Sequence, residues 1–214
     1  VGRSVILQLD LKDFFGSIHF GRVRGLLIAL GYGYQVASVL AALMTEAPRQ
    51  PVIVGGTRYF PPAGPRACPQ GAPTSPGLSN AVVVKMDRRL AGLARRYGFA
   101  YTRYADDLTF SGDDIAGAHA LRVLAQRVVE DEGFELNHDK TRIRRSGTRQ
   151  IVTGVVVNDV LGLSRQERRR LRAAIHRYAA AHAAGNADPA QLARLDGKVA
   201  YLSMLNAAQA RRLA

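Results

Sequence analysis

The sequence is poor in cysteine, in acidic residues and in long apolar runs. Cys68 is the single cysteine among 214 residues, which excludes an internal disulfide framework and a zinc site built from several cysteines. No apolar run approaches the roughly 20 residues that a membrane-spanning helix needs, and no signal peptide opens the chain. We therefore expect a cytoplasmic protein without a membrane partner.

Acidic residues are outnumbered by basic ones. Lys and Arg number 30 against 17 Asp and Glu, which gives a net charge of +13. Charged residues make up 22% of the chain and hydrophobic residues 47%, so the composition is that of a folded domain rather than a disordered tail. A surplus of this size favours a polyanionic partner, with nucleic acid first. The charge alone leaves a membrane surface open as the alternative.

Turn residues and hydrophobic periodicity predict short strands interleaved with helices. The expected strands and strand pairs are 5–10, 51–62, 99–111 and 150–157. The expected helices are 20–30, 34–46, a long helix capped by Ser75 or Ser79 and ending near 97, 115–132, and a helical region from 164 with a break near 185–189. Ser164 and Glu167 form a capping-box pattern. This order is typical of the α+β class, with a small antiparallel sheet covered by helices on one face.

Three aspartates stand where expected strands end or turn. Asp10 closes the first strand, and Asp106 and Asp107 lie at the tip of a hairpin. Adjacent like charges repel, and a divalent cation would neutralise them; oxygen ligands without His or Cys suit Mg²⁺. Together the three carboxylates could hold two metal ions that activate a hydroxyl and stabilise a leaving pyrophosphate. The alternative is that Asp106-Asp107 is simply a turn signal.

The loop from Pro69 to Pro76 is stiff and contains glycine. Gly71 would let the backbone approach a ligand closely, and Gln70 could hydrogen-bond a sugar or a base edge. Lys140 could donate a proton to a leaving pyrophosphate. Taken alone, the loop could equally be an ordinary proline-rich turn, and Lys140 a solvated surface lysine.

Taken together, five segments in order resemble the motifs of a bacterial reverse transcriptase palm, most closely a retron-type one. The segments are LQLDLKDFFGSIHFGRVRG (7–25), PQGAPTSPGLSN (69–80), YADD (104–107), GFELNHDKT (133–141) and RQIVTGVVVN (149–158). The resemblance implies an RNA-directed DNA polymerase, a nucleotidyltransferase that adds dNTPs to the 3′-hydroxyl of a DNA or RNA primer on an RNA template. It also implies that the cytoplasm is a bacterial one.

The same resemblance implies roles for individual residues. The metal ligands would be Asp10, Asp106, Asp107 and the main-chain carbonyl of Leu11, for two Mg²⁺ ions or Mn²⁺ in their place. The residues implied in binding the incoming nucleotide are Leu11, Lys12, Asp13, Phe14, Phe15, Gln70 and Gly71, with Phe15 as the aromatic gate that excludes a ribose 2′-hydroxyl. The residues implied in binding the primer are Tyr104, Val152, Thr153 and Gly154, and Lys140 matches the catalytic lysine of the fourth motif.

The resemblance also divides the chain into a palm, residues 1–158, and a helical thumb or connection segment, residues 159–214. Arginines at the start of the second part could bind phosphates of a primer–template duplex or form a solvated helix face. They are Arg165, Arg168, Arg169, Arg170 and Arg172. Retron-type relatives also bind a structured RNA, so a cognate non-coding RNA is a further expected partner. The sequence leaves open whether the system is a retron, a mobile intron, a diversity-generating element or antiviral defence.

Only nine residues precede Asp10, whereas the resembled family places a fingers domain before the first motif. We therefore expect a chain without fingers, with sequence missing upstream, that exposes apolar palm surface and tends to self-associate. One alternative is a truncated or inactive palm that acts as an RNA-binding module. An RNA-templated RNA polymerase also uses three acids, and a nuclease uses clustered acids but leaves Phe15 and Gln70 without a role.

Overall fold

The computed structural model describes residues 1–213, which cluster into two compact units. One unit contains residues 7–143, and the other joins residues 1–6 to the chain from 144 onward. The segment 144–158, expected to belong to the palm, thus clusters with the C-terminal helices. Within residues 1–213, every helix is too short or too polar to cross a membrane.

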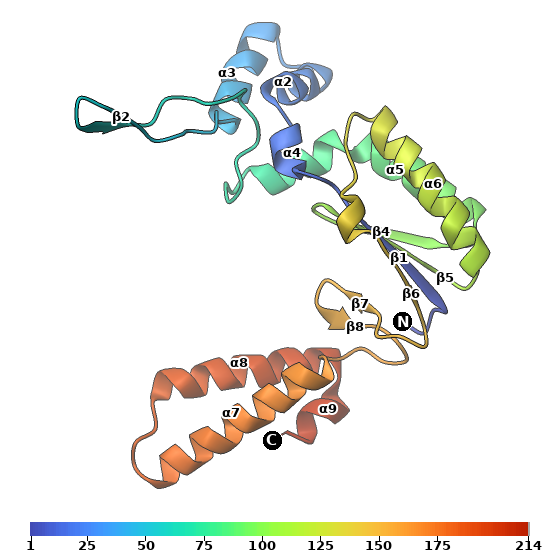
Figure 1. Cartoon of the computed structure of the whole chain (residues 1–214), viewed down its shortest axis with the longest axis vertical. Coiled ribbons are helices and arrows are strands. Elements are labelled where there is room, and N and C mark those ends of the chain that lie inside the picture. The colour runs from blue at the N-terminus through green and yellow to red at the C-terminus, as the bar shows by residue number, and fades with distance from the viewer. Residues whose placement is uncertain (214) are drawn as a thin grey trace. The chain divides into compact units, whose positions relative to one another are not determined.

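The fold is α+β, as the sequence predicts, and contains a four-stranded sheet (Figure 1). Its strands are β1 (Val5–Asp10), β4 (Ala100–Tyr104), β5 (Asp107–Gly112) and β6 (Arg142–Arg145), in the order β4-β5-β1-β6. β1 is buried at every position except the half-buried Gln8, as its nearly continuous apolar sequence requires. β4 pairs antiparallel with β5, so the two strands form the expected hairpin.

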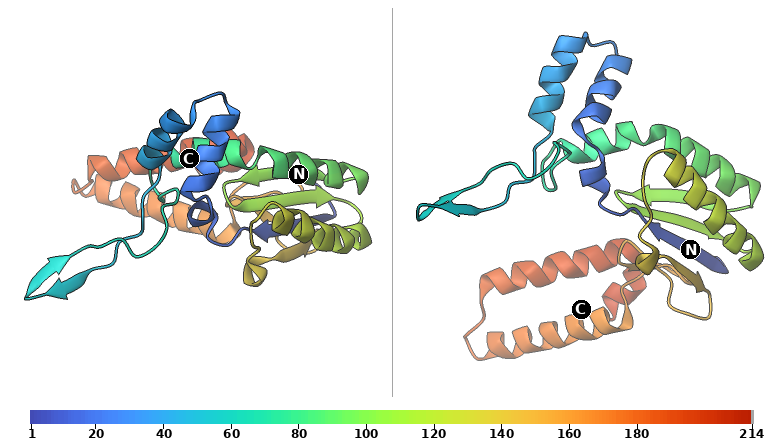
Figure 2. Two further views of the ribbon diagram at one scale, coloured as in Figure 1. Left: turned by 90° about the horizontal axis from the view of Figure 1, so that it is seen from above. Right: turned by 45° about the horizontal axis from the view of Figure 1, so that its top comes forward.

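Two helices cover one face of this sheet. They are α5 (Val84–Arg96) and α6 (Ile115–Asp131), which lie side by side in Figures 1 and 2. On α5 the buried residues Met86, Leu90 and Ala94 recur every four positions and form one apolar stripe. The buried positions of α6 include glycine and alanine, which let the two helices approach closely.

The long helix expected to end near residue 97 is divided into α4 (Ser75–Val82) and α5. Neither of the two serines considered as its cap performs that role. The Ser75 hydroxyl donates to the carbonyl of Pro69 (2.7 Å), and the Ser79 hydroxyl donates to the carbonyl of Pro76 (3.0 Å). The predicted serine cap is therefore wrong, because both hydroxyls are buried and satisfy carbonyls of the proline-rich segment.

Between β1 and α4 the chain forms several short elements. They are α1 (Phe14–Ser17), α2 (Phe20–Ala29), α3 (Tyr34–Met44), β2 (Val52–Val54) and β3 (Thr57–Tyr59). The helices α2 and α3 and the β2–β3 hairpin confirm the ranges expected from the sequence. Gly55 and Gly56 turn this hairpin with φ of 57° and 81°, which is the backbone that a two-residue hairpin turn of this hand requires.

Strand β6 was not expected from the sequence, nor was the short 3₁₀ turn His138–Lys140 that precedes it. Its sequence, RIRR, lacks the alternation that marks a half-buried strand. β6 lies at the edge of the sheet beside β1, where charged side chains are common because they discourage further pairing. The arginine-rich sequence therefore does not predict this strand, which is stabilised by pairing with β1.

The second unit is a small hairpin followed by helices. Its elements are β7 (Ile151–Val152), β8 (Val155–Val156), α7 (Arg165–Ala183), α8 (Pro189–Leu205) and α9 (Ala207–Arg211). The predicted capping box opens α7: the Ser164 hydroxyl accepts from the Glu167 N–H (3.2 Å), and the Glu167 carboxylate accepts from the Ser164 N–H (3.0 Å). Leucines from α7 and α8, including Leu171 and Leu202, form its apolar core.

Candidate active site

The tip of the β4–β5 hairpin carries two of the three candidate carboxylates. Tyr104 pairs with Asp107 across the strands, so the turn itself consists of Ala105 and Asp106. Ala105 has φ of 50°, a left-handed conformation that costs an alanine roughly 1–2 kcal/mol. Interactions around the turn must therefore hold it in place, and they also set the direction in which the carboxylates project.

The end of β1 is attached to this turn. The N–H of Leu11 donates to the carbonyl of Asp106 (3.0 Å). Asp10, the residue before it, is buried, and its own carbonyl accepts from the N–H of Asn137 (2.8 Å). Backbone hydrogen bonds thus bring the carboxyl end of β1 beside the hairpin tip, where the sequence predicted that the three aspartates would meet.

The carboxylates influence one another electrostatically. Partial burial raises the pKa of Asp107 above its usual range, and the charges of Asp106 and Asp10 raise it further, while Lys140 opposes the shift. The Lys140 ammonium lies 3.1 Å from each carboxylate oxygen of Asp10. This contact raises the pKa of Lys140, so the lysine is protonated at neutral pH.

The donor chemistry of this cluster fits a hard divalent cation. All donors are oxygens, and the charges of Asp106 and Asp10 add to the effect of burial in raising the pKa of Asp107. Within residues 1–213, however, no three His, Cys, Asp or Glu side chains close around one point as a metal cage. Mg²⁺ commonly takes only one or two carboxylates and completes its shell with water and substrate phosphates.

A cavity of about 560 Å³ lies beside the hairpin tip. Phe15, Gly71, Asn80, Tyr104 and Ala105 are among the residues that line it. Phe15 is half-buried, whereas its neighbour in the chain is a core residue. The alternative that Phe15 is an ordinary core aromatic therefore describes the preceding phenylalanine better.

That preceding residue, Phe14, is 3% exposed. Its ring centroid lies 5.3 Å from that of Phe15 and 5.8 Å from that of Phe134. Phe14 thus packs behind Phe15 and supports it. Tyr104, by contrast, is 71% exposed.

Other residues expected at the nucleotide do not line this cavity. Gln70 and Asp13 line a separate cavity of about 570 Å³ that does not include Phe15. The Lys12 N–H donates to the carbonyl of Glu135 (2.8 Å), and its ammonium pairs with the Glu135 carboxylate (2.9 Å). The amide and the side chain of Lys12 therefore both have protein partners, which the sequence did not reveal.

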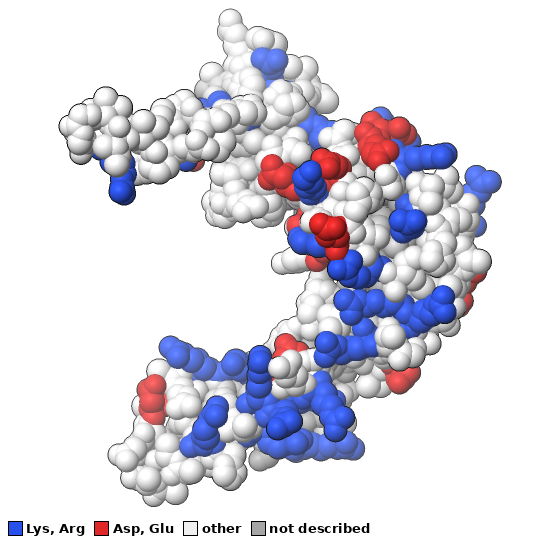
Figure 3. Space-filling view, viewed as in Figure 1, with Lys and Arg blue, Asp and Glu red and all other residues white. Residues whose placement is uncertain are grey.

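The arginines at the start of α7 form one surface. Arg165, Arg168, Arg169 and Arg172 line a hollow of about 580 Å³ together with Gln166 and Arg149; we call these four residues and Arg149 the α7 arginine surface. The spacing of the four on α7 places them on one helix face, and Figure 3 shows blue side chains crowded over the first turns of this helix. Arg170 lines a different hollow, beside Leu171.

Of the residues expected to bind the primer, Tyr104 lies on β4, and the other three lie on the β7–β8 hairpin. Val152 pairs with Val155, so Thr153 and Gly154 make the turn, with φ of 47° and 84°. Both values fit a two-residue turn of the hairpin type, in which glycine is favoured. The turn residues Thr153 and Gly154 are exposed.

Comparison with protein families decides what this arrangement is. The family model described as "Reverse transcriptase (RNA-dependent DNA polymerase)" matches residues 2–171. The chain belongs to the reverse transcriptase family. Its retron-type character follows from its relatives: it is 62% identical to the Retron Mx65 reverse transcriptase of Myxococcus xanthus over 100% of this chain and 49% of that protein.

Two further relatives are also described as retron reverse transcriptases. The Retron Mx162 reverse transcriptase of Myxococcus xanthus is 43% identical over 98% of this chain and 46% of its own length. The Retron Ec86 reverse transcriptase of Escherichia coli is 33% identical over 82% of this chain and 50% of its own length. The chain thus spans about half the length of the curated relatives it matches.

The fold likeness extends to a solved structure of remote sequence. A chain described as apo telomerase from Candida tropicalis, truncated from its C-terminal domain, superposes with a TM-score of 0.52 at 12% identity. The match covers 74% of this chain and 34% of that one. At such low identity the likeness concerns the fold alone.

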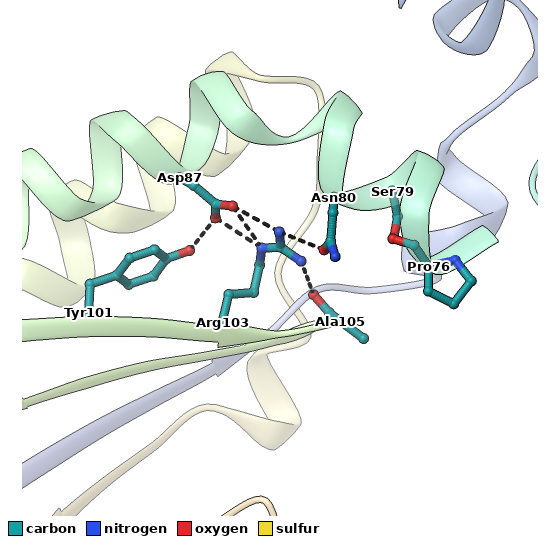
Figure 4. A network of polar contacts seen from close by, with 7 residues as sticks. All are labelled: Pro76, Ser79, Asn80, Asp87, Tyr101, Arg103 and Ala105. Carbon is teal, nitrogen blue, oxygen red and sulfur yellow. Dashed lines mark hydrogen bonds and ion pairs between the residues drawn. The ribbon is translucent and has the colours of Figure 1, made fainter. Parts of the chain in front are cut away.

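One feature of this site was missed by sequence reasoning. Arg103, on β4, donates to the carboxylate of Asp87, to the side chain of Asn80 and to the carbonyl of Ala105 (Figure 4). The available signal was slight: Arg103 shares a strand face with Tyr101, two residues earlier, and that face is turned inward. A charged residue on an inward strand face requires partners.

Proposed function

We propose that this chain provides the catalytic palm of an RNA-directed DNA polymerase that joins dNTPs to a primer 3′-hydroxyl on an RNA template. The observation that supports this most strongly is the backbone junction between β1 and the β4–β5 tip, which gathers Asp10, Asp106 and Asp107. The cavity lined by Phe15 lies beside the same tip and is proposed to receive the incoming nucleotide.

In this proposal the three carboxylates, with the carbonyl of Leu11, hold two Mg²⁺ ions, and Mn²⁺ could replace them. When bound, these ions would promote ionisation of the 3′-hydroxyl and stabilise the leaving pyrophosphate. Lys140 is already protonated through its contact with Asp10. It would therefore carry the proton that a departing pyrophosphate accepts.

Selection of dNTPs over NTPs would come from Phe15. Its ring forms part of the wall of the cavity beside the hairpin tip. Tight packing against Phe14 keeps the ring from moving aside. A 2′-hydroxyl would meet this ring, whereas a 2′-hydrogen would not.

The helical unit is proposed to hold nucleic acid. The α7 arginine surface brings five guanidinium groups to one hollow, which suits successive phosphates of a duplex. Val152, Thr153 and Gly154 on the β7–β8 turn are proposed to contact the primer. A structured non-coding RNA, as expected for a retron, is the further partner proposed for this unit.

Self-association is also proposed. Apolar side chains are exposed on α3, including Val36 (54%), Val39 (61%) and Leu43 (79%). The β2–β3 hairpin exposes Ile53 (67%) as well. Exposed apolar surface of this kind favours association, which sedimentation velocity over a range of concentrations would detect as a rising sedimentation coefficient.

The test of the catalytic proposal is primer extension on an RNA template with Mg²⁺ and dNTPs. It compares the 214-residue chain with the protein product of the open reading frame that encodes it. Replacing Asp106 and Asp107 together by Asn should lower incorporation by about 10³-fold or more, because the metal-binding charge is lost. Asp159→Asn, which changes an exposed aspartate in the other unit, serves as the matched control.

A second function, an RNA-binding module without catalysis, is favoured by the α7 arginine surface alone. It predicts RNA binding that weakens steeply with salt and equal behaviour of the wild type and the double Asn variant in every assay. Incorporation that survives the double substitution would sink the polymerase proposal. Binding without any incorporation, by both protein lengths, would move the binding module forward.

A further inference from the structure

We propose that Arg103 is a positioning residue that holds the Ala105-Asp106 turn and thereby sets the placement of Asp106 and Asp107. The inference rests on the proposed function, since it assigns these two carboxylates to metal binding. It adds a residue outside all five motif roles taken from the family resemblance.

The guanidinium of Arg103 is almost fully enclosed, with its side chain 7% exposed. Its Nε lies 2.9 Å and 3.2 Å from the two carboxylate oxygens of Asp87, and its Nη2 lies 2.8 Å from one of them. Nη2 also donates to Oδ1 of Asn80 at 3.0 Å. Arg103 thus clamps β4 onto α4 and α5, in the planar fork geometry that only arginine provides.

The remaining contact points toward the catalytic turn. Nη1 of Arg103 donates to the carbonyl of Ala105 at 3.1 Å (Figure 4). A salt bridge that merely stabilised the fold would need Asp87 alone. Here the same rigid group fastens the one residue of the hairpin tip that is held at positive φ without being glycine. Strained backbone persists where surrounding contacts over-determine it, and Arg103 supplies such a contact.

The consequence reaches both parts of the site. The next residue, Asp106, has its carbonyl bonded to the N–H of Leu11, so the turn is held from two directions. Arg103, Asn80 and Ala105 also line the cavity that contains Phe15. A change in the Arg103 fork would therefore move the carboxylates relative to the nucleotide cavity without altering any carboxylate.

The test uses Mn²⁺ as a paramagnetic probe, with binding to the 214-residue chain followed by electron paramagnetic resonance. Arg103→Lys keeps the charge but cannot span Asp87 and Ala105, so Mn²⁺ should bind roughly tenfold more weakly, as for other residues that orient metal ligands. Asn80→Ala, a change at an exposed residue, should weaken binding in the same direction by about twofold.

Tyr101→Phe is the matched control. The Tyr101 hydroxyl donates to the same Asp87 oxygen as Nε of Arg103 approaches, at 2.7 Å, yet its loss leaves the hydrogen bonds of Arg103 to Asp87, Asn80 and Ala105 in place. Mn²⁺ affinity should stay at the wild-type value in Tyr101→Phe, although urea denaturation should show reduced stability. A merely structural role for Arg103 predicts instead that both variants lose metal affinity in proportion to lost stability.

Each result decides the inference separately from the proposed function. Weaker Mn²⁺ binding by Arg103→Lys with an unchanged Tyr101→Phe supports it, even if no dNTP is incorporated. The inference is overturned if the wild type and all variants bind Mn²⁺ with equal affinity. It is also overturned if the double Asn substitution at Asp106 and Asp107 leaves Mn²⁺ binding at the wild-type value. If Arg103→Lys fails to fold, an unchanged affinity in Asn80→Ala overturns the inference, and a weakened one supports it.

Discussion

The two-residue turns of the β2–β3 and β4–β5 hairpins are stabilised by different means. The β2–β3 turn uses Gly55 and Gly56, which adopt positive φ without steric cost and are exposed. The β4–β5 turn uses Ala105 and Asp106, and Ala105 needs the Arg103 contact to keep a positive φ. A glycine turn is stable by its own chemistry, whereas the acidic turn depends on the residues packed around it.

The difference has a functional sense. A turn built from glycine would leave the carboxylates beside it free to vary in direction. An alanine locked by a buried arginine has one conformation, so the following aspartates project in one direction. Substitutions that weaken one hairpin at a time test this contrast.

The largest effect is expected from Asp87→Ala. It would leave the enclosed guanidinium of Arg103 without its carboxylate, and removal of one partner from a buried ion pair costs about 3–5 kcal/mol. Urea denaturation should show this loss. Asp131→Ala, which removes an exposed partner of Arg89, should cost no more than about 1 kcal/mol. Similar losses in the two variants would contradict the conclusion that the β4–β5 turn depends on the ion pair between Arg103 and Asp87.

The next effect concerns the cavity beside the tip of the β4–β5 hairpin. Phe15→Ala removes the ring that a ribose 2′-hydroxyl would meet, so the preference for dNTPs over NTPs should fall by about 10–100-fold. Single-nucleotide incorporation with each triphosphate measures this ratio. Phe60→Ala, at an exposed phenylalanine after β3, should leave the ratio unchanged. An unchanged ratio in Phe15→Ala would remove the gate from the mechanism.

A smaller effect is expected at the contact between α5, which carries Asp87, and the end of α6. Arg89 and Lys85 on α5 lower the pKa of Glu132, which follows α6. A carboxylate with a lowered pKa in the folded state stabilises the fold above its unfolded pKa, and this contribution disappears as the pH falls through the folded value. Glu132→Gln should therefore lower the free energy of unfolding by about 1 kcal/mol at pH 7, and wild type and variant should converge in acid.

The smallest effect distinguishes the two turns themselves. Gly56→Ala places a Cβ at φ of 81° and should destabilise the β2–β3 hairpin by about 1 kcal/mol. Hydrogen exchange should rise in that hairpin alone, with incorporation unchanged. Ala105→Gly, the reverse change, should alter global stability by less than about 1 kcal/mol, yet it should weaken Mn²⁺ binding because the turn gains freedom. Equal metal affinity would show that Arg103 alone fixes the turn.

Much of this fold could be predicted because the relevant signals are local. The glycine pair of β2–β3, the capping box at Ser164 and the apolar run of β1 each specify structure through neighbouring residues. The serine cap of α4 was wrong because Ser75 is drawn to the carbonyl of Pro69, a competition that the sequence does not display. The edge strand β6 was missed because its arginines conceal it.

The sequence alone determined which residues are candidates for the chemistry: Asp10, Asp106 and Asp107 stand at strand ends or turns, and the order of the motifs added Phe15 through the resemblance to the family. Only the tertiary structure decided how they are held. Arg103 on β4 binds Asp87 on α5, and Lys140 contacts Asp10, which lies 130 positions earlier in the chain. Such contacts depend on packing between distant segments, and that packing leaves no periodic pattern in the chain.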